Sequence, residues 1–179
     1  MNENRGYRYR IRLAGMVAAL LLAGAPLAGA RAAGQDVGIP VGSVPEAAQL
    51  EDLDGAAVDL TDYIGRKPVL IQFWATWCPL CAALEPGFQA ARRQYGDALD
   101  ILVIAVGVNQ TPRSIRRHTE RHAPPGRVLF DSRGRAARAF KAPTTSYVVA
   151  LDSRGRVVYT GVGADQDIAR AAALAMSSR

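Results

Sequence analysis

The segment from Lys67 to Ala75, KPVLIQFWA, constrains the fold of this chain more than any other stretch. A continuous run of aliphatic, β-branched and aromatic residues is typical of a strand that is buried on both faces. Such a strand needs packing layers on each side of its sheet. The residues that follow, 79–96, carry apolar side chains at roughly helical spacing, with Pro86 as an expected kink and Gly96 as the expected stop. The sequence therefore predicts a strand followed by a helix in a layered α/β fold.

Strands and helices are expected to alternate along the rest of the chain. A small hairpin around Asp54-Gly55 precedes the buried strand. The elements expected after the first helix are a strand at 101–108, a helix at 111–123 that Thr111 caps and Pro112 begins, a strand at 127–131, a helix at 132–141, a hairpin at 146–161 and a last helix that starts near Ala164 or Asp165. This order predicts a central mixed β-sheet flanked by helices, with an N-terminal β-hairpin extension.

The amino-terminal residues have the layout of an export signal or a membrane anchor. Four arginines precede an uncharged and largely apolar run at residues 13–30, which ends in small residues and is interrupted by Pro26. We therefore expect residues 1–30 to be a signal peptide or an anchor, residues 31–43 a linker, and residues 44–179 the folded domain. Either form of leader would place the domain outside the cytoplasm, in the periplasm or an equivalent compartment.

The charge of the chain does not indicate a nucleic-acid partner. Lys and Arg number 22 against 16 Asp and Glu, so the formal net charge is +6. Acidic residues are interleaved with the basic ones almost everywhere, which is typical of ordinary solvated faces. We expect no nucleic-acid binding and a monomeric domain.

The only two cysteines, Cys78 and Cys81, lie three positions apart in FWATWCPLC. Outside the cytoplasm such a pair tends to be oxidised. A disulfide that closes so short a loop stabilises a fold little, which favours a chemical role over a structural one. The pair could also be half of a zinc site, but zinc takes four ligands and the chain has no further cysteine. Copper(I) accepts two thiolates, so a copper-binding or copper-chaperone module remains the alternative.

The combination of a buried strand, WCxxC and a helix with a proline five residues past the second cysteine resembles the thioredoxin fold. The later stretch APTTSYVVALDSRGRVVYTGVG resembles the second signature of that family, a Pro-Thr pair that opens a hairpin strand. The hairpin before the buried strand and the spelling FWATWC are similar to the exported TlpA-like and ResA-like branch, which contains disulfide reductases. The resemblance covers about residues 44–177.

The resemblance assigns roles around the cysteines. It implies that Cys78, at the start of a helix that stabilises its thiolate, attacks the substrate and that the more buried Cys81 resolves the mixed disulfide. Pro79 suits the first helical turn, and Leu80 offers an apolar docking surface. Trp77 is expected to cover the disulfide, whereas Trp74 is expected to pack into the fold.

The second signature implies a substrate-binding edge. Pro143 would be a cis proline that faces the disulfide, and Ala142 would present its backbone N–H and C=O to an extended substrate. Thr144 belongs to the same motif.

Two positions depart from the family. Gln72 stands where thioredoxins carry a buried Asp, and Leu84 stands where the branch usually has Glu, with Glu85 one position later. Since one residue is a swing of about 100° on a helix, Glu85 is only a possible proton relay to the second cysteine. His118 and His122 could share a helix face, but the arginines around them favour a solvated basic helix over a metal site.

The expected function is therefore that of an exported thiol–disulfide oxidoreductase, more specifically a disulfide reductase of protein clients in the TlpA-like group, for which cytochrome c biogenesis is one possible setting. It needs no cofactor, and the branch implies a membrane thiol carrier as its electron donor. The absence of a histidine beside Pro79 argues mildly for a reductant over an oxidant.

Overall fold

The structure is a computed structural model that describes residues 37–177. Its elements are, in chain order, β1 (Gln49–Glu51), β2 (Ala57–Asp59), the 3-10 turn η1 (Leu60–Asp62), β3 (Val69–Trp74), α1 (Pro79–Tyr95), the 3-10 turn η2 (Gly96–Ala98), β4 (Asp100–Val106), α2 (Pro112–Thr119), β5 (Arg127–Asp131), α3 (Arg135–Ala139), β6 (Val148–Leu151), β7 (Val157–Gly161) and α4 (Ile168–Ser177). The predicted leader, residues 1–30, lies outside the described residues. Within 37–177 no helix is long and apolar enough to span a bilayer.

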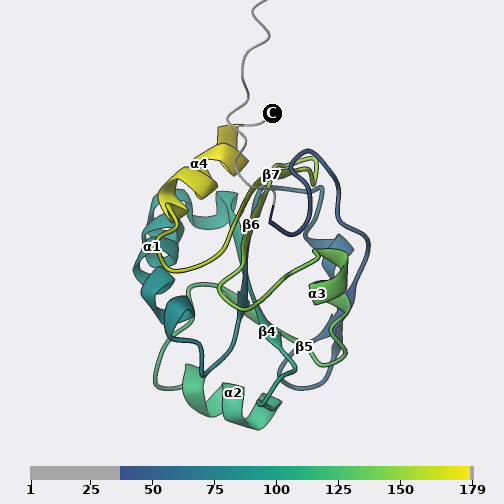
Figure 1. Cartoon of the computed structure of the whole chain (residues 1–179), viewed down its shortest axis with the longest axis vertical. Coiled ribbons are helices and arrows are strands. Elements are labelled where there is room, and N and C mark those ends of the chain that lie inside the picture. Colours follow the sequence, from purple (N-terminus) through teal and green to yellow (C-terminus); the bar gives the residue numbers. More distant parts are fainter. Residues whose placement is uncertain (1–36, 178–179) are drawn as a thin grey trace, which may run out of the picture. The chain divides into compact units, whose positions relative to one another are not determined.

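One mixed sheet carries the fold, as predicted. Its strand order is β2-β1-β5-β4-β3-β6-β7. The strands β3, β4 and β5 are parallel, while β1 and β6 add antiparallel neighbours on either side. Figure 1 shows the sheet nearly edge-on, with α1 and α4 covering one face and α3 the other. The predicted strand at Lys67–Ala75 is therefore the central β3, and its first five residues are buried.

Alternation along β6 separates the two halves of the core. Val148 and Ala150 pack with side chains of α1 and α4, whereas Val149 and Leu151 pack on the α3 side with the aromatic ring of Phe73. Because successive side chains of a strand point to opposite faces, this one strand contributes to both layers. β3 therefore lies between two apolar layers. These layers hold its carboxyl end, from which the cysteine segment continues, in place.

The helices begin where local capping residues allow. Thr111 caps α2 reciprocally with Ser114, and Pro112 is its first residue, as predicted. The last helix starts at Ile168 rather than near Ala164 or Asp165, because the Asp167 side chain accepts the Arg170 N–H and supplies the cap that the earlier positions lack.

The folded domain includes part of the segment that was predicted to be a linker. Ile39 is buried in the core, and its N–H donates to the hydroxyl of Tyr147 at 3.0 Å. The Gly42 N–H donates to the Val157 carbonyl at 2.7 Å. A Cβ at Gly38 would lie 2.2 Å from the Tyr147 hydroxyl oxygen, so only glycine fits this approach. The packed chain thus extends beyond the expected boundary at residue 44, at least to Ile39.

Candidate functional site: a dithiol pair at the start of α1

The cysteine pair lies where β3 ends and α1 begins. Cys78 is the N-cap of α1, and its sulfur accepts the Cys81 N–H at 3.1 Å. Pro79 is the first helical residue, where a missing N–H costs no hydrogen bond. The helix dipole and the free amide hydrogens of this first turn stabilise negative charge on a sulfur at the cap.

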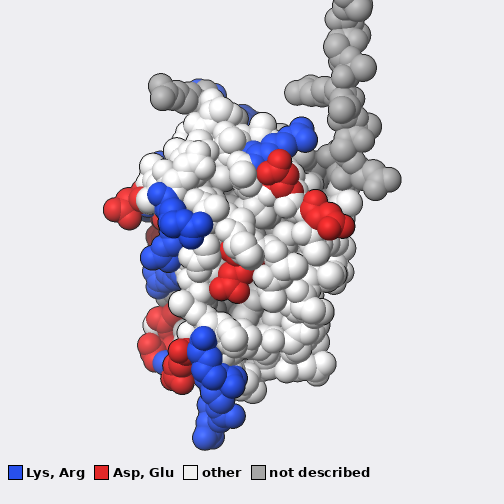
Figure 2. Space-filling view, turned by 90° about the vertical axis from the view of Figure 1, so that its left-hand side faces the viewer, with Lys and Arg blue, Asp and Glu red and all other residues white. Residues whose placement is uncertain are grey.

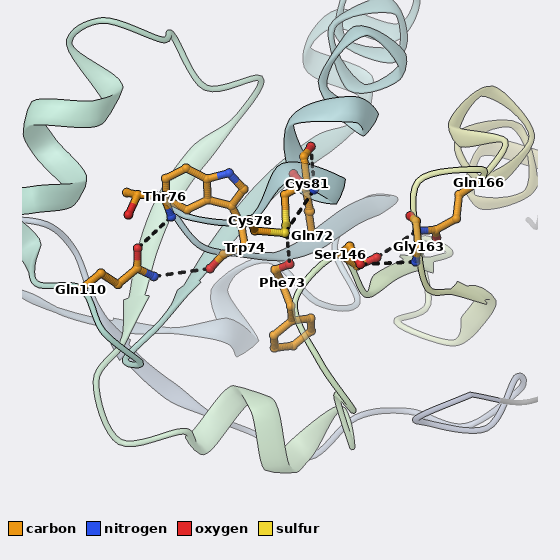
Figure 3. Close-up of a disulfide and its surroundings, with 10 residues drawn as sticks. All are labelled: Gln72, Phe73, Trp74, Thr76, Cys78, Cys81, Gln110, Ser146, Gly163 and Gln166. Carbon is orange, nitrogen blue, oxygen red and sulfur yellow. Dashed lines mark hydrogen bonds between the residues drawn. A yellow bond between two sulfur atoms is a disulfide. The ribbon is translucent and has the colours of Figure 1, made fainter.

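The two sulfurs are bonded to each other but differ in their surroundings. The Cα atoms of Cys78 and Cys81 are 5.3 Å apart. Cys78 is 7% exposed and Cys81 only 1%, which matches the predicted division between an outer and an inner sulfur. Cys81 Sγ lies 3.8 Å from the carbonyl oxygen of Phe73 (Figure 3). An incoming group can therefore approach only from the Cys78 side.

Gln110 fixes the loop that leads into Cys78. Its side-chain oxygen accepts the Thr76 N–H at 3.0 Å and its side-chain nitrogen donates to the Trp74 carbonyl at 3.5 Å (Figure 3). The same nitrogen also donates to the Val106 carbonyl at 2.6 Å. This one amide joins the ends of β3 and β4. The sequence alone gave no signal for Gln110, since its partners are brought together only by the sheet.

The two tryptophans have different positions. Trp74 packs into the fold, as expected, and does so against the cluster of Ala75, Cys78 and Cys81. Trp77 is 48% exposed, and its indole N–H donates to the Val108 carbonyl at 3.0 Å. Trp74 is therefore the half-buried aromatic contact of the cysteines, while Trp77 lies at the rim of the site.

Ser146, and not Pro143, lies beside β3 at the disulfide. The Ser146 N–H donates to the Phe73 carbonyl at 2.9 Å, the same oxygen that lies near Cys81 Sγ. The peptide bond before Pro143 is trans, so the expectation of a cis proline facing the disulfide is wrong. The reason is register: β6 begins at Val148, paired with Gln72, which leaves Pro143 exposed in the preceding loop. Counting back along β6 from the hairpin turn would have indicated Ser146.

The backbone N–H of Ala142 is also occupied. It donates to the Ala137 carbonyl at 2.8 Å, so it is not free for a substrate as the sequence had suggested. By contrast, no hydrogen bond of the Thr145 backbone is found within the described part of the chain. Thr145 directly precedes Ser146, which makes it the open backbone position next to the disulfide.

An apolar groove begins at Trp77, the residue before Cys78. It has a volume of about 380 Å³ and its lining includes Trp77, Val108, Ala142, Pro143, Thr144 and Thr145. The side chains of Trp77 and Val108 are about half exposed at its rim. Leu80, on the first turn of α1, is 48% exposed and extends the apolar surface outside the groove. The groove thus brings together four of the residues that the sequence assigned to substrate binding, Trp77, Ala142, Pro143 and Thr144, although the Ala142 N–H is occupied and the peptide bond before Pro143 is trans.

A small polar cavity lies on the inner side of Cys81. Its volume is about 20 Å³, and its lining includes Gln72, Cys81, Glu85, His118 and His122. The Gln72 side-chain nitrogen donates to the Cys81 carbonyl at 3.2 Å. Glu85 is half-buried here, so the one-residue shift along α1 does not remove it from the neighbourhood of the inner sulfur.

The two histidines are only partly solvated. His122 is exposed, but His118 is half-buried, with its ring centroid 5.3 Å from that of Trp74 and 4.7 Å from that of His122. Burial, followed by the nearby His122 and Arg121, lowers the pKa of His118 below its ordinary value, while Glu85 acts in the opposite direction. His118 thus favours the neutral form, which can accept a proton.

In the part of the chain that the structure describes, metal ligands and surface charges are the other features that could form a site. Among residues 37–177 no group of three or more His, Cys, Asp or Glu side chains is placed to hold a metal. On the face covered by α1 and α4, basic and acidic side chains lie next to one another in several small groups, with uncharged surface between the groups (Figure 2).

Comparisons with known proteins match nearly the whole described domain. The family model described as Redoxin matches residues 40–175. A thioredoxin-like protein, YneN, from Bacillus subtilis is 29% identical over 132 residues, which are 72% of this chain and 75% of that protein. The thiol-disulfide oxidoreductase ResA of Geobacillus thermodenitrificans is 27% identical over 132 residues, covering 73% and 75% of the two chains.

Solved structures show the same fold. A putative thiol:disulfide interchange protein DsbE from Chlorobium tepidum superposes with a TM-score of 0.63 at 20% identity and covers 75% of this chain and 99% of that one. StoA from Bacillus subtilis gives a TM-score of 0.59 at 18% identity, covering 73% and 97%. The architecture around the cysteine pair is therefore the thioredoxin fold, as the sequence predicted.

Proposed function

Because this chain belongs to the Redoxin family, we propose that it is a thiol–disulfide oxidoreductase that reduces disulfides of protein clients outside the cytoplasm. The observation that carries the proposal is the asymmetry of the pair: Cys78 caps α1 at the surface, and Cys81 is buried directly behind it. The names of relatives such as ResA, a thiol-disulfide oxidoreductase, support the same chemistry.

The reaction follows from the position of the two sulfurs. In the reduced protein the Cys78 thiolate attacks one sulfur of a client disulfide, and the other client sulfur leaves as a thiolate. Cys81 then loses its proton and attacks Cys78, which breaks the mixed disulfide and releases the second client thiolate. Two electrons pass to the client, whose thiolates take up two protons, and the Cys78–Cys81 disulfide remains.

The groove beside Cys78 is the proposed site for the client segment. An extended segment that hydrogen-bonds to the open backbone of Thr145 would place its sulfur at Cys78, with Trp77, Pro143 and Thr144 contacting its side chains. Backbone pairing of this kind gives affinity without sequence selectivity. Leu80 would contact the client on the other side of the sulfur.

The electron supply and the location complete the proposal. A reductase in an oxidising compartment must be reduced again after each turnover, and we propose a membrane thiol protein as the donor. The basic and apolar leader in the sequence supports export, either by cleavage or by anchoring through residues 13–30.

The reduction potential of the Cys78–Cys81 couple tests the proposed direction. The protein would be equilibrated with glutathione or dithiothreitol buffers, and the fraction of free thiol measured after acid quenching. A value near or below about −230 mV is expected of a reductase, whereas a value near about −120 mV would identify an oxidase.

A further inference from the structure

The reaction requires a proton acceptor for Cys81 that the sequence did not identify. Cys81 is 1% exposed, so its thiol cannot lose its proton directly to bulk solvent. The side chain of Gln72, on β3, is an amide and already donates to the Cys81 carbonyl. An amide is neither an acid nor a base near neutral pH, so the acceptor must be another group of the same cavity.

Three other titratable side chains line the cavity that Cys81 also lines. Glu85 comes from α1, His118 from α2 and His122 from the turn after α2. A volume of about 20 Å³ has room for about one water molecule, which can carry a proton between polar groups that do not touch. Trp74 and the apolar residues of β4 and β5 close the remaining sides.

Of the three, Glu85 and His118 are half-buried, and His118 is the one whose ring also packs against Trp74. Its ring is held edge-on there, whereas His122 is exposed. Imidazole is the side chain that changes charge nearest to neutral pH, which suits a group that must take up and release a proton in each turnover. The charged groups that act on it are Glu85 from α1 and Arg121 and His122 from its own segment.

We propose that His118 accepts the proton of the Cys81 thiol during resolution of the mixed disulfide, with the Glu85 carboxylate stabilising the imidazolium that forms. The inference rests on the proposed function, since it concerns its second step. The proton leaves Cys81 for the imidazole, the Cys81 thiolate attacks Cys78, and the imidazolium then gives its proton to water at the exposed His122 side. In the reverse reaction the same proton returns to Cys81.

Single-turnover reduction of the chromogenic disulfide 5,5′-dithiobis(2-nitrobenzoate) separates the two steps. Mixing it with the fully reduced full-length protein releases one thionitrobenzoate when Cys78 attacks and a second when Cys81 resolves the adduct. Both phases would be recorded between about pH 5.5 and pH 9.5 for the wild type and for His118→Gln. The control variants are His122→Gln and, at the exposed start of α2, Arg113→Gln.

The expected result is specific to one phase and to one range of pH. His118→Gln should slow the second phase by about 100-fold near pH 7, and the difference from wild type should narrow above the ordinary thiol pKa of about 8.5. The first phase should be unchanged, and Arg113→Gln should behave as wild type. Glu85→Gln should move the second-phase profile to lower pH, because the imidazolium loses its counter-charge.

Several outcomes would overturn the inference. They are an identical second-phase profile in His118→Gln and wild type, a loss that stays the same at all pH values, or a full effect from His122→Gln alone. Any of these, with two normal phases in the wild type, refutes the role of His118 and leaves the proposed function intact. Failure of the reduced wild type to release thionitrobenzoate would refute the proposed function itself.

Discussion

Hydrogen bonds made by its N–H, its carbonyl and its hydroxyl hold Ser146 at the position next to the inner sulfur. Its N–H donates to the Phe73 carbonyl, its carbonyl accepts the Gln166 side-chain nitrogen at 2.9 Å, and its hydroxyl accepts the Gly163 N–H at 3.3 Å. Its φ of 62° lies in the left-handed region, which side-chain-bearing residues rarely adopt. The surrounding bonds therefore determine this conformation.

A proline at this position should be harmful, although the family pattern had suggested a proline facing the disulfide. Ser146→Pro removes the N–H that bonds to Phe73 and requires φ near −65°, so we expect a loss of more than about 1 kcal/mol in the free energy of unfolding. Ser146→Gly, which accepts positive φ, should lose less. Urea denaturation of the oxidised forms compares them, and an equal or higher stability of the proline variant would contradict the conformation described here.

The asymmetry of the two cysteines predicts which variant traps a client. Cys81→Ser should accumulate a mixed disulfide with a peptide that carries one disulfide, because the resolving sulfur is absent. Cys78→Ser should trap little or none, since its remaining sulfur is only 1% exposed. Intact-mass measurement after acid quenching gives the yield of adduct, and a comparable yield from both variants would rule out the assigned order of attack.

The positions of Cys78, Pro79 and Cys81 could be predicted because they depend on one local motif. The strand end, the helix cap and the first helical turn are all determined by residues that are close together in the sequence. The predictions for Pro143 and Ala142 were wrong because the positions of these residues do not depend on a local motif. Which loop residue meets β3 depends on the register of β6, and that register is set by packing across the sheet rather than by the loop sequence.

At the level of elements, the site depends on the ends of β3 and β4 staying together. Gln110 makes three hydrogen bonds to these ends, and two of its partners, Trp74 and Thr76, belong to the segment that leads into Cys78. Deleting the amide leaves the Thr76 N–H and two carbonyls without these partners.

Gln110→Ala should therefore loosen the entry to α1. We expect a loss of about 1–3 kcal/mol in the free energy of unfolding and a slower reaction of Cys78. Gln89→Ala is the matched control, because Gln89 makes a single surface hydrogen bond, to the Ala123 carbonyl. Thermal denaturation and the first phase of thionitrobenzoate release measure both effects. Equal behaviour of the two variants would show that Gln110 does not hold the loop.

Some element boundaries followed from sequence because caps and stops are local signals, whereas the helices expected at 111–123 and 132–141 are shorter in the structure, Pro112–Thr119 and Arg135–Ala139. Gly96 ends α1, and Thr111 caps α2, as predicted. The start of α4 was misplaced because Ala164, Asp165 and Asp167 are all acceptable neighbours of a helix start. The cap that Asp167 supplies and the packing of Ile168 in the core together place the start at Ile168.

At the scale of the whole molecule, Tyr147 joins the start of the domain to its centre. Its ring is fully buried and its hydroxyl accepts the Ile39 N–H across 108 residues of sequence. Burial raises the pKa of Tyr147 to about 12. The folded state therefore binds the phenolic proton more tightly than the unfolded chain does.

Tyr147→Phe should lower stability at neutral pH and flatten its dependence on alkaline pH. The lost acceptor leaves the Ile39 N–H unpaired, at a cost of about 1–3 kcal/mol. In the wild type the raised pKa adds to the free energy of unfolding. This added stability is fully present below the ordinary tyrosine pKa of about 10 and is lost as the pH rises towards about 12. Part of the alkaline loss should remain in the variant, because burial also raises the pKa of Tyr159.

Urea denaturation between about pH 8 and pH 11.5 makes this comparison, with Tyr95→Phe as the control. The control removes a hydroxyl near the end of α1 for which no hydrogen bond is found within residues 37–177. A Tyr147→Phe profile parallel to that of the wild type would contradict the buried hydroxyl described here.

The short span of the Cys78–Cys81 disulfide links electron transfer to folding by a closed thermodynamic cycle. Closing so small a loop restrains the unfolded chain by only about 2 kcal/mol, so most of the difference in stability between the two redox forms reflects the folded site itself. Each 1.4 kcal/mol by which the oxidised form is the more stable makes the folded couple about 30 mV more reducing than the same cysteines in the unfolded chain. Two denaturation curves, one for each redox form, therefore show without any redox buffer whether folding makes the Cys78–Cys81 couple more reducing or more oxidising.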